Sequence, residues 1–403
     1  MNGWQKAVTF LALKRNTSLM LVMLVLAGTG EKLWVGFVPK YLETLGAGVL
    51  IIGLYDALQT FLGAVYAYPG GLLTDRWGQR RSLLCFSAIS LMGYLLVLFW
   101  QHWVALLLGS FLFLAWSALS LPATFTVVAT SLSSNQHTMG IGVQSLIRRI
   151  PMMLGPLIGG WLVTRFGWMA GVQLALLGCI GLGLITALFQ WQMVDPPGEP
   201  MGRSLAESVT FFCVVKQFSP ALRELLVSDI LIRFCERIPY AFVILWAMNT
   251  GGASAQEYGF LVALEMAAAM LCYVPVAHLA DRYGRRPFVL ATFVFFTLFP
   301  VTLLWADNLA WLAVAFVVRG LKEFGEPARK ALIITEAVPE LQARMYGAYY
   351  LIRDSVVTVG SFLGAGLWSL NPRANFLGAA VFGLAGTLWF WWFIYRQPHP
   401  QKG

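Results

Sequence analysis

Twelve long apolar runs dominate this chain of 403 residues and restrict what it can fold into. A helix that crosses a bilayer needs about 20 predominantly apolar residues, and each run is close to that length or longer. The runs cover approximately 18–43, 48–74, 82–100, 103–129, 139–164, 168–192, 223–250, 256–280, 287–305, 309–335, 345–369 and 374–395. Only 12% of the residues are charged, about half the share found in an average soluble domain. The sequence therefore predicts an all-α polytopic membrane protein with 12 transmembrane helices.

A polar stretch divides the runs into two sets of six. Residues 193–220 form this stretch, which contains Pro196, Pro197, Gly198 and Pro200. We expect an N-terminal six-helix bundle over 1–192, a cytoplasmic linker over 193–222 and a C-terminal six-helix bundle over 223–403. Within the linker, residues 204–218 predict a short amphipathic helix at the membrane surface.

The two sets are an internal repeat. The segment Gly70–Arg81 matches Val276–Pro287 at an offset of 206, and Leu146–Arg149 matches Leu351–Asp354 at an offset of 205. The second register also aligns Gly155 with Gly360 and Glu31 with Glu236. Because six is an even number of spans, both halves run through the membrane in the same direction. The sequence thus predicts two pseudo-symmetric bundles related by an axis along the membrane normal.

Lysine and arginine residues set the orientation, because cytoplasmic loops are enriched in them. If the N-terminus is cytoplasmic, the outer side receives Lys40, Arg165 and Arg373. The inner side receives Lys6, Lys14, Arg15, Arg76, Arg80, Arg81, Arg203, Lys216, Arg223, Arg282, Arg285, Arg286, Arg329, Lys330, Arg344, Arg396 and Lys402. We therefore expect both termini in the cytoplasm and the chain in the plasma (inner) membrane. The same loops account for the net charge of +9, so we expect no nucleic-acid partner.

Motifs of other protein classes are missing from the sequence. It has no GxxxxGK[ST] segment for ATP and no HExxH segment for zinc. The five cysteines form no CxxC pair, and the four histidines lie far apart. We expect neither an enzyme nor a metal site, and no cofactor.

Ionisable residues inside predicted membrane helices are the main candidates for function, because charge is costly at that depth. They fall on helices 1, 2, 5, 7, 8, 10 and 11: Glu31, Lys32, Asp56, Arg148, Arg149, Arg233, Glu236, Arg237, Glu265, Arg319, Lys322, Glu323, Glu326, Arg353 and Asp354. A buried carboxylate beside an arginine can bind and release a proton when the pair rearranges. This is the minimal machinery for coupling proton flow to substrate flow.

The charges on helix 10 share one face. Arg319, Lys322, Glu323 and Glu326 follow a spacing of i, i+3, i+4 and i+7, which allows Arg319 to pair with Glu323 and Lys322 to pair with Glu326. Pro327 can interrupt the helix next to Glu326, which would give a hinge, a cation site or a simple kink. Three aromatic residues, Trp34, Tyr240 and Tyr349, lie one turn from a candidate charge, and we expect Trp34 and Tyr240 to line the substrate site.

Two motifs give the sequence a family resemblance. The loop Gly71–Arg81 fits Gly-x-Leu-x-Asp-Arg-x-Gly-x-Arg-Arg, the pattern between helices 2 and 3 of the major facilitator superfamily, and the resemblance covers nearly the whole chain. It implies that helices 3, 6, 9 and 12 face lipid, which agrees with the absence of the ionisable residues named above from these four predicted helices. It also implies that the two copies of the loop gate the inner side. The gating residues are Asp75, Arg76, Gly78, Arg80, Asp281, Arg282, Gly284 and Arg286.

The second motif lies on predicted helix 5. Gly142, Gly155-Pro156 and Gly159-Gly160 resemble the signature of the family's proton-coupled drug antiporters, with Pro151 where that signature has Gly. Small residues at this spacing let helices approach closely.

Together these observations predict a proton-coupled secondary transporter that works by alternating access and exports small organic molecules. The alternatives are a proton symporter importing an organic anion, a sugar or a metal chelate, and a receptor that does not transport. A lipid flippase is a variant of the exporter. The expected partners are a small-molecule substrate, protons and the lipid bilayer, and the short loops suggest a monomer. The residues expected to bind substrate or protons are Glu31, Lys32, Trp34, Arg148, Arg149, Arg233, Glu236, Arg237, Tyr240, Glu265, Arg319, Lys322, Glu326, Arg353 and Asp354.

Overall fold

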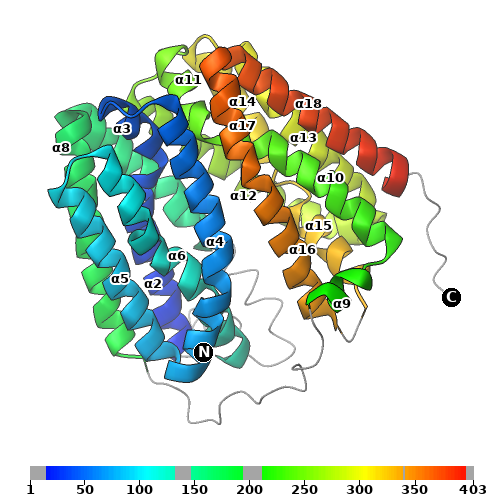
Figure 1. Ribbon diagram of the computed structural model, residues 1–403, viewed down its shortest axis with the longest axis horizontal. Helices are drawn as coiled ribbons and strands as arrows, with labels where there is room; N and C mark the ends of the chain where they lie inside the picture. The colour runs from blue at the N-terminus through cyan, green and yellow to red at the C-terminus, as the bar shows by residue number, and fades with distance from the viewer. Residues whose placement is uncertain (1–14, 132–146, 194–210, 339–340, 396–403) are drawn as a thin grey trace, which may run out of the picture. The chain divides into compact units, whose positions relative to one another are not determined.

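The computed structural model describes residues 15–131, 147–193, 211–338 and 341–395, and the regular elements in these ranges are all helices. The chain forms two compact units (Figure 1). Unit 1 comprises Met1–Ala47, Leu58–Ser204 and Ser254–Ala263, and unit 2 comprises Gly48–Ala57, Leu205–Ala253 and Leu264–Gly403. Each unit therefore contains a ten-residue segment from the opposite half of the sequence. The bundle and linker boundaries expected at 192 and 222 stay a prediction.

The first helix of each half is broken in the same way. In the N-terminal half, α2 (Arg15–Lys32) is followed by a 3-10 turn, η1 (Val35–Phe37), and by α3 (Val38–Thr44). In the C-terminal half, α10 (Pro220–Arg237), η4 (Tyr240–Phe242) and α11 (Val243–Asn249) repeat this sequence of elements. A proline lies in the first turn of α3, and Pro239 precedes η4. Since proline cannot donate a backbone hydrogen bond, both breaks follow from the sequence.

The second and third helices are joined by a tight turn in both halves. Helix α4 (Val49–Trp77) leads to α5 (Gln79–Phe99), and α12 (Ala255–Tyr283) leads to α13 (Arg286–Leu304). Gly78 and Gly284 occupy these turns with φ angles of 81° and 89°. Glycine adopts such angles without the clash that a Cβ atom causes.

The fourth helix is continuous in one half and interrupted in the other. Helix α6 (Trp103–Ser131) has no break, whereas its counterpart is split into α14 (Leu309–Leu321) and α15 (Glu326–Thr335). Pro327 lies in the first turn of α15. The interruption expected beside Glu326 is therefore confirmed, and it turns Glu326 away from the direction that a straight helix would give it.

The remaining helices complete the two bundles. Helix α8 (Arg149–Trp191) consists of two helices that meet at Gly167, where φ is 79°. In the second half, α16 (Gln342–Val357), α17 (Val359–Leu370), α18 (Pro372–Phe390) and a π-helical turn, η6 (Trp391–Tyr395), follow in order. Part of the predicted surface helix forms α9 (Phe211–Lys216). Its residues 204–210 and Gly142 of the helix 5 motif lie outside the described ranges.

Glycines of the helix 5 motif and their repeats set the closest helix contacts. A Cβ atom on Gly159 would lie 1.8 Å from the carbonyl oxygen of Leu33, and one on Gly364 would lie 2.1 Å from that of Ile238. Gly155 likewise faces the backbone of Lys32. Only glycine permits this approach, so the same helix pair is fixed in both halves by the same residue type.

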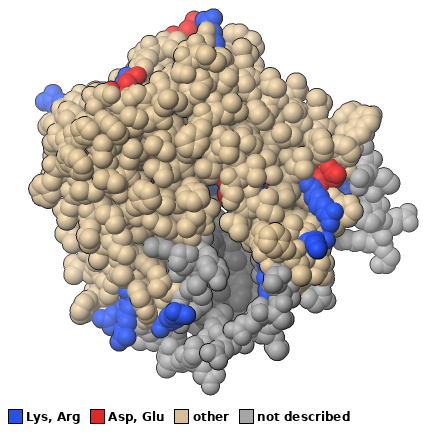
Figure 2. Space-filling model, in the orientation of Figure 1, with Lys and Arg blue, Asp and Glu red and all other residues tan. Residues whose placement is uncertain are grey.

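The surface is largely apolar, as expected for a chain in lipid. Figure 2 shows a face of mostly uncharged residues, with Lys and Arg in a few small groups toward its edges. In the described ranges, six helices are long and apolar enough to cross a membrane by length and composition. Helix α8 contains most of two of the predicted spans, and α6 contributes a further apolar helix over Trp103–Ser117. Other predicted spans are interrupted, as in α14–α15, or carry several charges, as in α12. The structure is an all-α fold with twelve spans in two six-helix halves.

Candidate functional site

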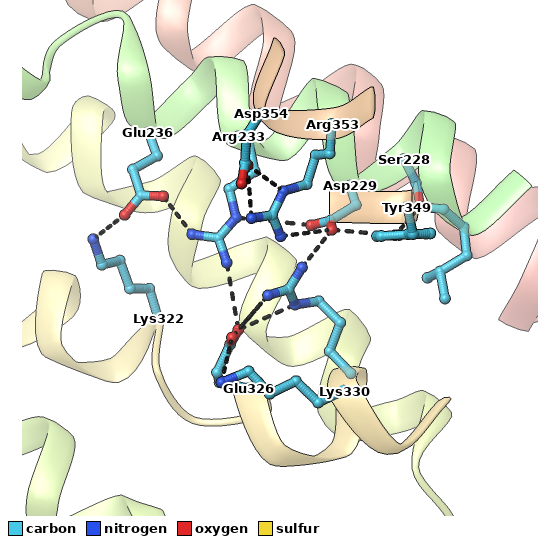
Figure 3. Close-up of polar contacts among 12 residues, drawn as sticks. Ser228, Asp229, Arg233, Glu236, Lys322, Glu326, Lys330, Tyr349, Arg353 and Asp354 are labelled. Carbon is cyan, nitrogen blue, oxygen red and sulfur yellow. Dashed lines mark hydrogen bonds and ion pairs between the residues drawn. The ribbon is translucent and has the colours of Figure 1, made fainter. Parts of the chain in front are cut away.

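A cluster of charged residues fills the interior of unit 2 (Figure 3). We call it the ion network, and it comprises Asp229, Arg233, Glu236, Lys322, Glu326, Arg329, Lys330, Tyr349, Arg353 and Asp354. These side chains come from α10, from the break after α14, from α15 and from α16. Helices 7, 10 and 11 of the predicted order thus converge in one place.

Asp229 is the most enclosed acid of the ion network, with an exposed fraction of 0%. Its Oδ2 atom forms an ion pair with Arg329 and accepts hydrogen bonds from Arg353 at 3.3 Å and from Tyr349 at 3.1 Å. Its Oδ1 atom lies 3.8 Å from Nε of Arg233. Three arginines therefore surround one carboxylate. A buried charge is tolerated only when it is paired in this way.

Glu236 and Glu326 extend the ion network toward helix 10. Glu236 accepts hydrogen bonds of 2.6 Å from both Arg233 and Lys322. Glu326 forms ion pairs with Arg329 at 2.7 Å and with Arg233 at 3.4 Å. The expectation that Lys322 pairs with Glu326 is wrong, because the helix ends at Leu321 and Lys322 reaches Glu236 instead. Glu236 and Glu326 therefore each have at least two basic neighbours.

A second set of charges in unit 2 surrounds Tyr240. The Arg237 guanidinium lies over this ring at 4.7 Å, and that of Arg319 lies at 5.9 Å from it. Arg319 is also paired with Glu265 at 3.2 Å, and Arg237 with Asp56 at 2.9 Å. Tyr240 itself is 43% exposed. The arrangement is a row of acid, arginine, tyrosine, arginine and acid with its aromatic centre open.

The candidate residues of unit 1 form a smaller group. Lys32 donates a hydrogen bond of 2.9 Å to Glu31, and the charge of Glu31 also acts on Arg148. Arg149 begins α8. The Trp34 side chain is 1% exposed and packs edge-on against Tyr94 and Phe113. Trp34 therefore lies in the core of unit 1, and its expected contact with substrate stays a prediction.

The expected gating residues lie at two equivalent turns. Gly78 and Gly284 adopt the left-handed conformation described above. Arg76 and Arg282 occupy the last turns of α4 and α12, where the negative end of the helix dipole favours a cation. The Arg80 guanidinium lies 5.1 Å from the Trp191 ring, and Arg286 begins α13. The side chains of Asp75 and Asp281 are outside the described part of the structure.

Five residues of these clusters are not among the predicted site residues: Asp56, Asp229, Arg329, Lys330 and Tyr349. Asp229 was not recognised as an intramembrane charge, and Asp56 was recognised but not selected. Arg329 was assigned to a cytoplasmic loop, whereas the structure buries it to 1% exposure. The available signal was the spacing of Asp229, Arg233 and Glu236, which places a third charge on the same face of α10.

Comparisons with known proteins identify the family. Residues 20–251 and 225–403 both match the model of the Major Facilitator Superfamily. Among curated proteins, "Multidrug resistance protein MdtG" of Serratia proteamaculans is 25% identical over 411 residues, which cover 96% of this chain and 95% of that protein. "Multi-drug resistance efflux pump PmrA homolog" of Lactococcus lactis is 22% identical over 399 residues, covering 93% and 94%.

Solved structures agree on the fold. The nucleoside transporter NupG gives a TM-score of 0.74 at 14% identity, over 96% of this chain and 100% of that chain. An inward-facing bacterial homolog of the human lysosomal transporter Spinster gives a TM-score of 0.72 at 14% identity, over 94% and 96%. The family model matches both halves of the chain, the loop motif occurs twice, and the first helix of each half is broken in the same way. The chain is therefore a transporter, not an enzyme, and it belongs to the major facilitator superfamily.

Proposed function

We propose that this protein is a proton-coupled exporter of small organic molecules that works by alternating access. The observation that carries the proposal is the match, over nearly the full length of the chain, to relatives named as multidrug resistance proteins and efflux pumps. The same names favour export over the importing symporter considered above.

The charge arrangement of unit 2 supports coupling to protons. Carboxylates and arginines from α10, α15 and α16 are paired within it, and Glu236 holds two cations at once. A buried carboxylate with two cationic neighbours can exchange one partner for another at a small cost in free energy, because the number of buried charges stays the same. Burying an additional unpaired charge at such a site costs much more free energy. We assign substrate contact to Arg233, Glu236, Tyr240, Glu265, Arg319, Lys322, Glu326, Arg353 and Asp354 in unit 2, and to Glu31, Lys32, Trp34, Arg148 and Arg149 in unit 1. We assign proton coupling to Arg237.

We further propose a monomer in the plasma (inner) membrane with both termini in the cytoplasm. The distribution of lysine and arginine supports this orientation even when Arg329, which is buried, is not counted among the cytoplasmic basic residues. A phosphatase that is active only outside the cytoplasm, fused after Gly403, should be inactive. An active fusion would contradict the orientation.

Gradient-driven uptake into proteoliposomes tests the exporter directly. Vesicles with an acidic lumen are offered tetraphenylphosphonium, an organic anion and a zwitterion in turn. We expect accumulation of at least one compound above that of protein-free vesicles, abolished when nigericin with equal potassium on both sides collapses the pH gradient without creating a membrane potential. Permanently charged probes are needed because a weak base enters an acidic vesicle without any protein. Accumulation only when the lumen is alkaline would indicate proton symport and contradict the proposal.

A further inference from the structure

Asp56 lies at the beginning of α4 and is 3% exposed. Its Oδ1 atom is 2.9 Å from Nη2 of Arg237, and its Oδ2 atom accepts a hydrogen bond of 2.6 Å from Ser361. Arg237 also donates to the backbone oxygen of Asp56 at 2.7 Å and to the Ser361 hydroxyl at 3.2 Å. Three side chains from α4, α10 and α17 thus form a closed polar ring, which we call the Asp56 ring.

The helix packing around the Asp56 ring is tight. A Cβ atom on Gly53, one turn before Asp56, would lie 2.5 Å from the Cβ atom of Ala365 on α17. The charged group that faces Asp56 from α10 is Arg237, and α17 presents the uncharged Ser361. The neighbours of Asp56 on its own helix, Tyr55, Gln59 and Thr60, carry no charge. The charge of Asp56 is therefore balanced by its ion pair with Arg237.

This balance differs from that of the ion network. If Asp229 became neutral, the three arginines would keep Glu236, Glu326 and Asp354 as partners. The ion network, however, holds five basic and four acidic side chains, so its charge would rise from +1 to +2 in a largely buried place, which is strongly unfavourable. If Asp56 became neutral, one arginine would lose its partner. That arginine also lies against the Tyr240 ring, which is 43% exposed, so a cation–π contact remains for it. Asp56 is thus a buried acid that can accept a proton at moderate cost.

The internal repeat shows that the Asp56 ring is not a requirement of the fold. In the opposite half, Gly259 packs against Pro156 as Gly53 packs against α17, with a Cβ distance of 2.3 Å to the Pro156 carbonyl oxygen. The residue equivalent to Asp56 there is Val262, and the residue equivalent to Ser361 is Pro156 itself. The same helix contact is therefore made without any polar ring.

We propose that Asp56 is the binding site of the coupling proton and that Arg237 is released when the proton binds. This inference rests on the proposed proton-coupled function. One proton joins the Asp56 carboxylate, the ion pair with Arg237 is broken, and the charge of the site rises from zero to plus one. Helix α4 is continuous, but its residues to Ala57 belong to unit 2 and those from Leu58 to unit 1. Protonation thus loosens α4 from α10 and α17 at the point where the helix passes from one unit to the other.

Purified protein in liposomes tests the assignment through two readouts. The first is the number of protons moved per tetraphenylphosphonium, from a pH dye in the lumen. The second is exchange of labelled for unlabelled tetraphenylphosphonium without a proton gradient, after subtraction of the exchange seen in protein-free vesicles. For Asp56→Asn we expect exchange within about twofold of wild type and at least a tenfold fall in protons per substrate. Asp56→Glu should restore proton movement. Glu43→Gln, which removes a partly exposed carboxylate of α3, should leave both readouts unchanged.

The possible failures can be told apart. An Asp56→Asn variant with the wild-type ratio of protons to substrate would overturn the assignment and leave the proposed function intact. Wild-type protein that exchanges the probe without moving protons would overturn proton coupling itself. If Asp56→Asn does not fold, the variant Asp56→Asn/Arg237→Gln removes both charges, and it should show the same loss of proton movement with exchange retained. Proton movement retained in this double variant would also overturn the assignment.

Discussion

Asp229 on α10 and Arg329 on α15 form an ion pair in which each side chain is 1% exposed, although 100 residues separate them in sequence. Each charge offsets the largest part of the free-energy cost of burying the other. Removing one member of such a pair leaves an uncompensated charge and typically costs about 3–5 kcal/mol.

The first prediction concerns the stability of unit 2. Asp229→Asn should lower the unfolding temperature of the purified protein clearly, because Arg329, Arg353 and Arg233 lose the one acid that all three share, and Glu326 and Asp354 offset only part of their charge. Lys330→Gln is the matched control, since the Lys330 side chain is 47% exposed and its ion pair with Glu326 spans 3.5 Å. Exposed pairs contribute about 0–1 kcal/mol. Equal thermal unfolding of the two variants would show that the ion network is not a structural centre.

The second prediction concerns the repeated glycine contact. Gly364→Ala should destabilise the protein, because the added Cβ atom would lie 2.1 Å from the carbonyl oxygen of Ile238. A backbone atom, unlike a flexible side chain, cannot move away without shifting a helix. Gly366→Ala on the same helix should be neutral or slightly stabilising, since nothing lies within 4 Å and alanine is the better helix former by about 1 kcal/mol. Thermal unfolding of both variants measures the difference. A Gly364→Ala variant as stable as wild type would refute the close approach.

The third prediction concerns the turn between α4 and α5. Gly78 has φ 81° and ψ 164°, a region that other residues enter at a cost of about 1–3 kcal/mol. Gly78→Ala should therefore reduce transport by disturbing the loop motif. Gly63→Ala, inside α4 with nothing within 4 Å, should not. Probe uptake per molecule of folded protein separates the two variants, and equal uptake would argue against a gating role.

The fourth prediction separates substrate contact from proton binding. Glu236→Gln removes the acid shared by Arg233 and Lys322, and Glu31→Gln removes the partner of Lys32. We expect both variants to fold and to lose proton-coupled flux. In contrast to Asp56→Asn, Glu236→Gln should also lose substrate exchange. Full activity of Glu31→Gln and Glu236→Gln would show that neither carboxylate contacts the substrate or takes part in coupling.

Sequence alone predicted the fold because its signals are local and repeated. The apolar runs indicated the helices, and Pro327 indicated the break in predicted helix 10, whereas the break at Pro239 was not predicted. The offset of 205 is reproduced by the structure, in which η1 and η4 occupy equivalent positions. Glycines at Gly159 and Gly364 predicted close packing, and the structure shows which backbone each one meets.

The candidate site was less accessible to sequence reasoning because charge pairing depends on distant residues. Periodicity placed Arg319 and Lys322 on one face but could not show that Glu265 and Glu236 would pair with them. The distribution of basic residues assigned Arg329 to the cytoplasmic side, because its burial depends on Asp229, which is 100 residues away. Asp56 similarly depends on Arg237, which is 181 residues away.

The most direct test of proton-coupled export is the sign of the pH change inside liposomes when substrate enters. Protein-containing vesicles carry a pH dye in the lumen and receive tetraphenylphosphonium outside, and protein-free vesicles provide the baseline. Antiport predicts that protons leave as the probe enters, so the lumen becomes more alkaline in proportion to uptake. A lumen that becomes more acidic as the probe enters would establish symport and contradict the account.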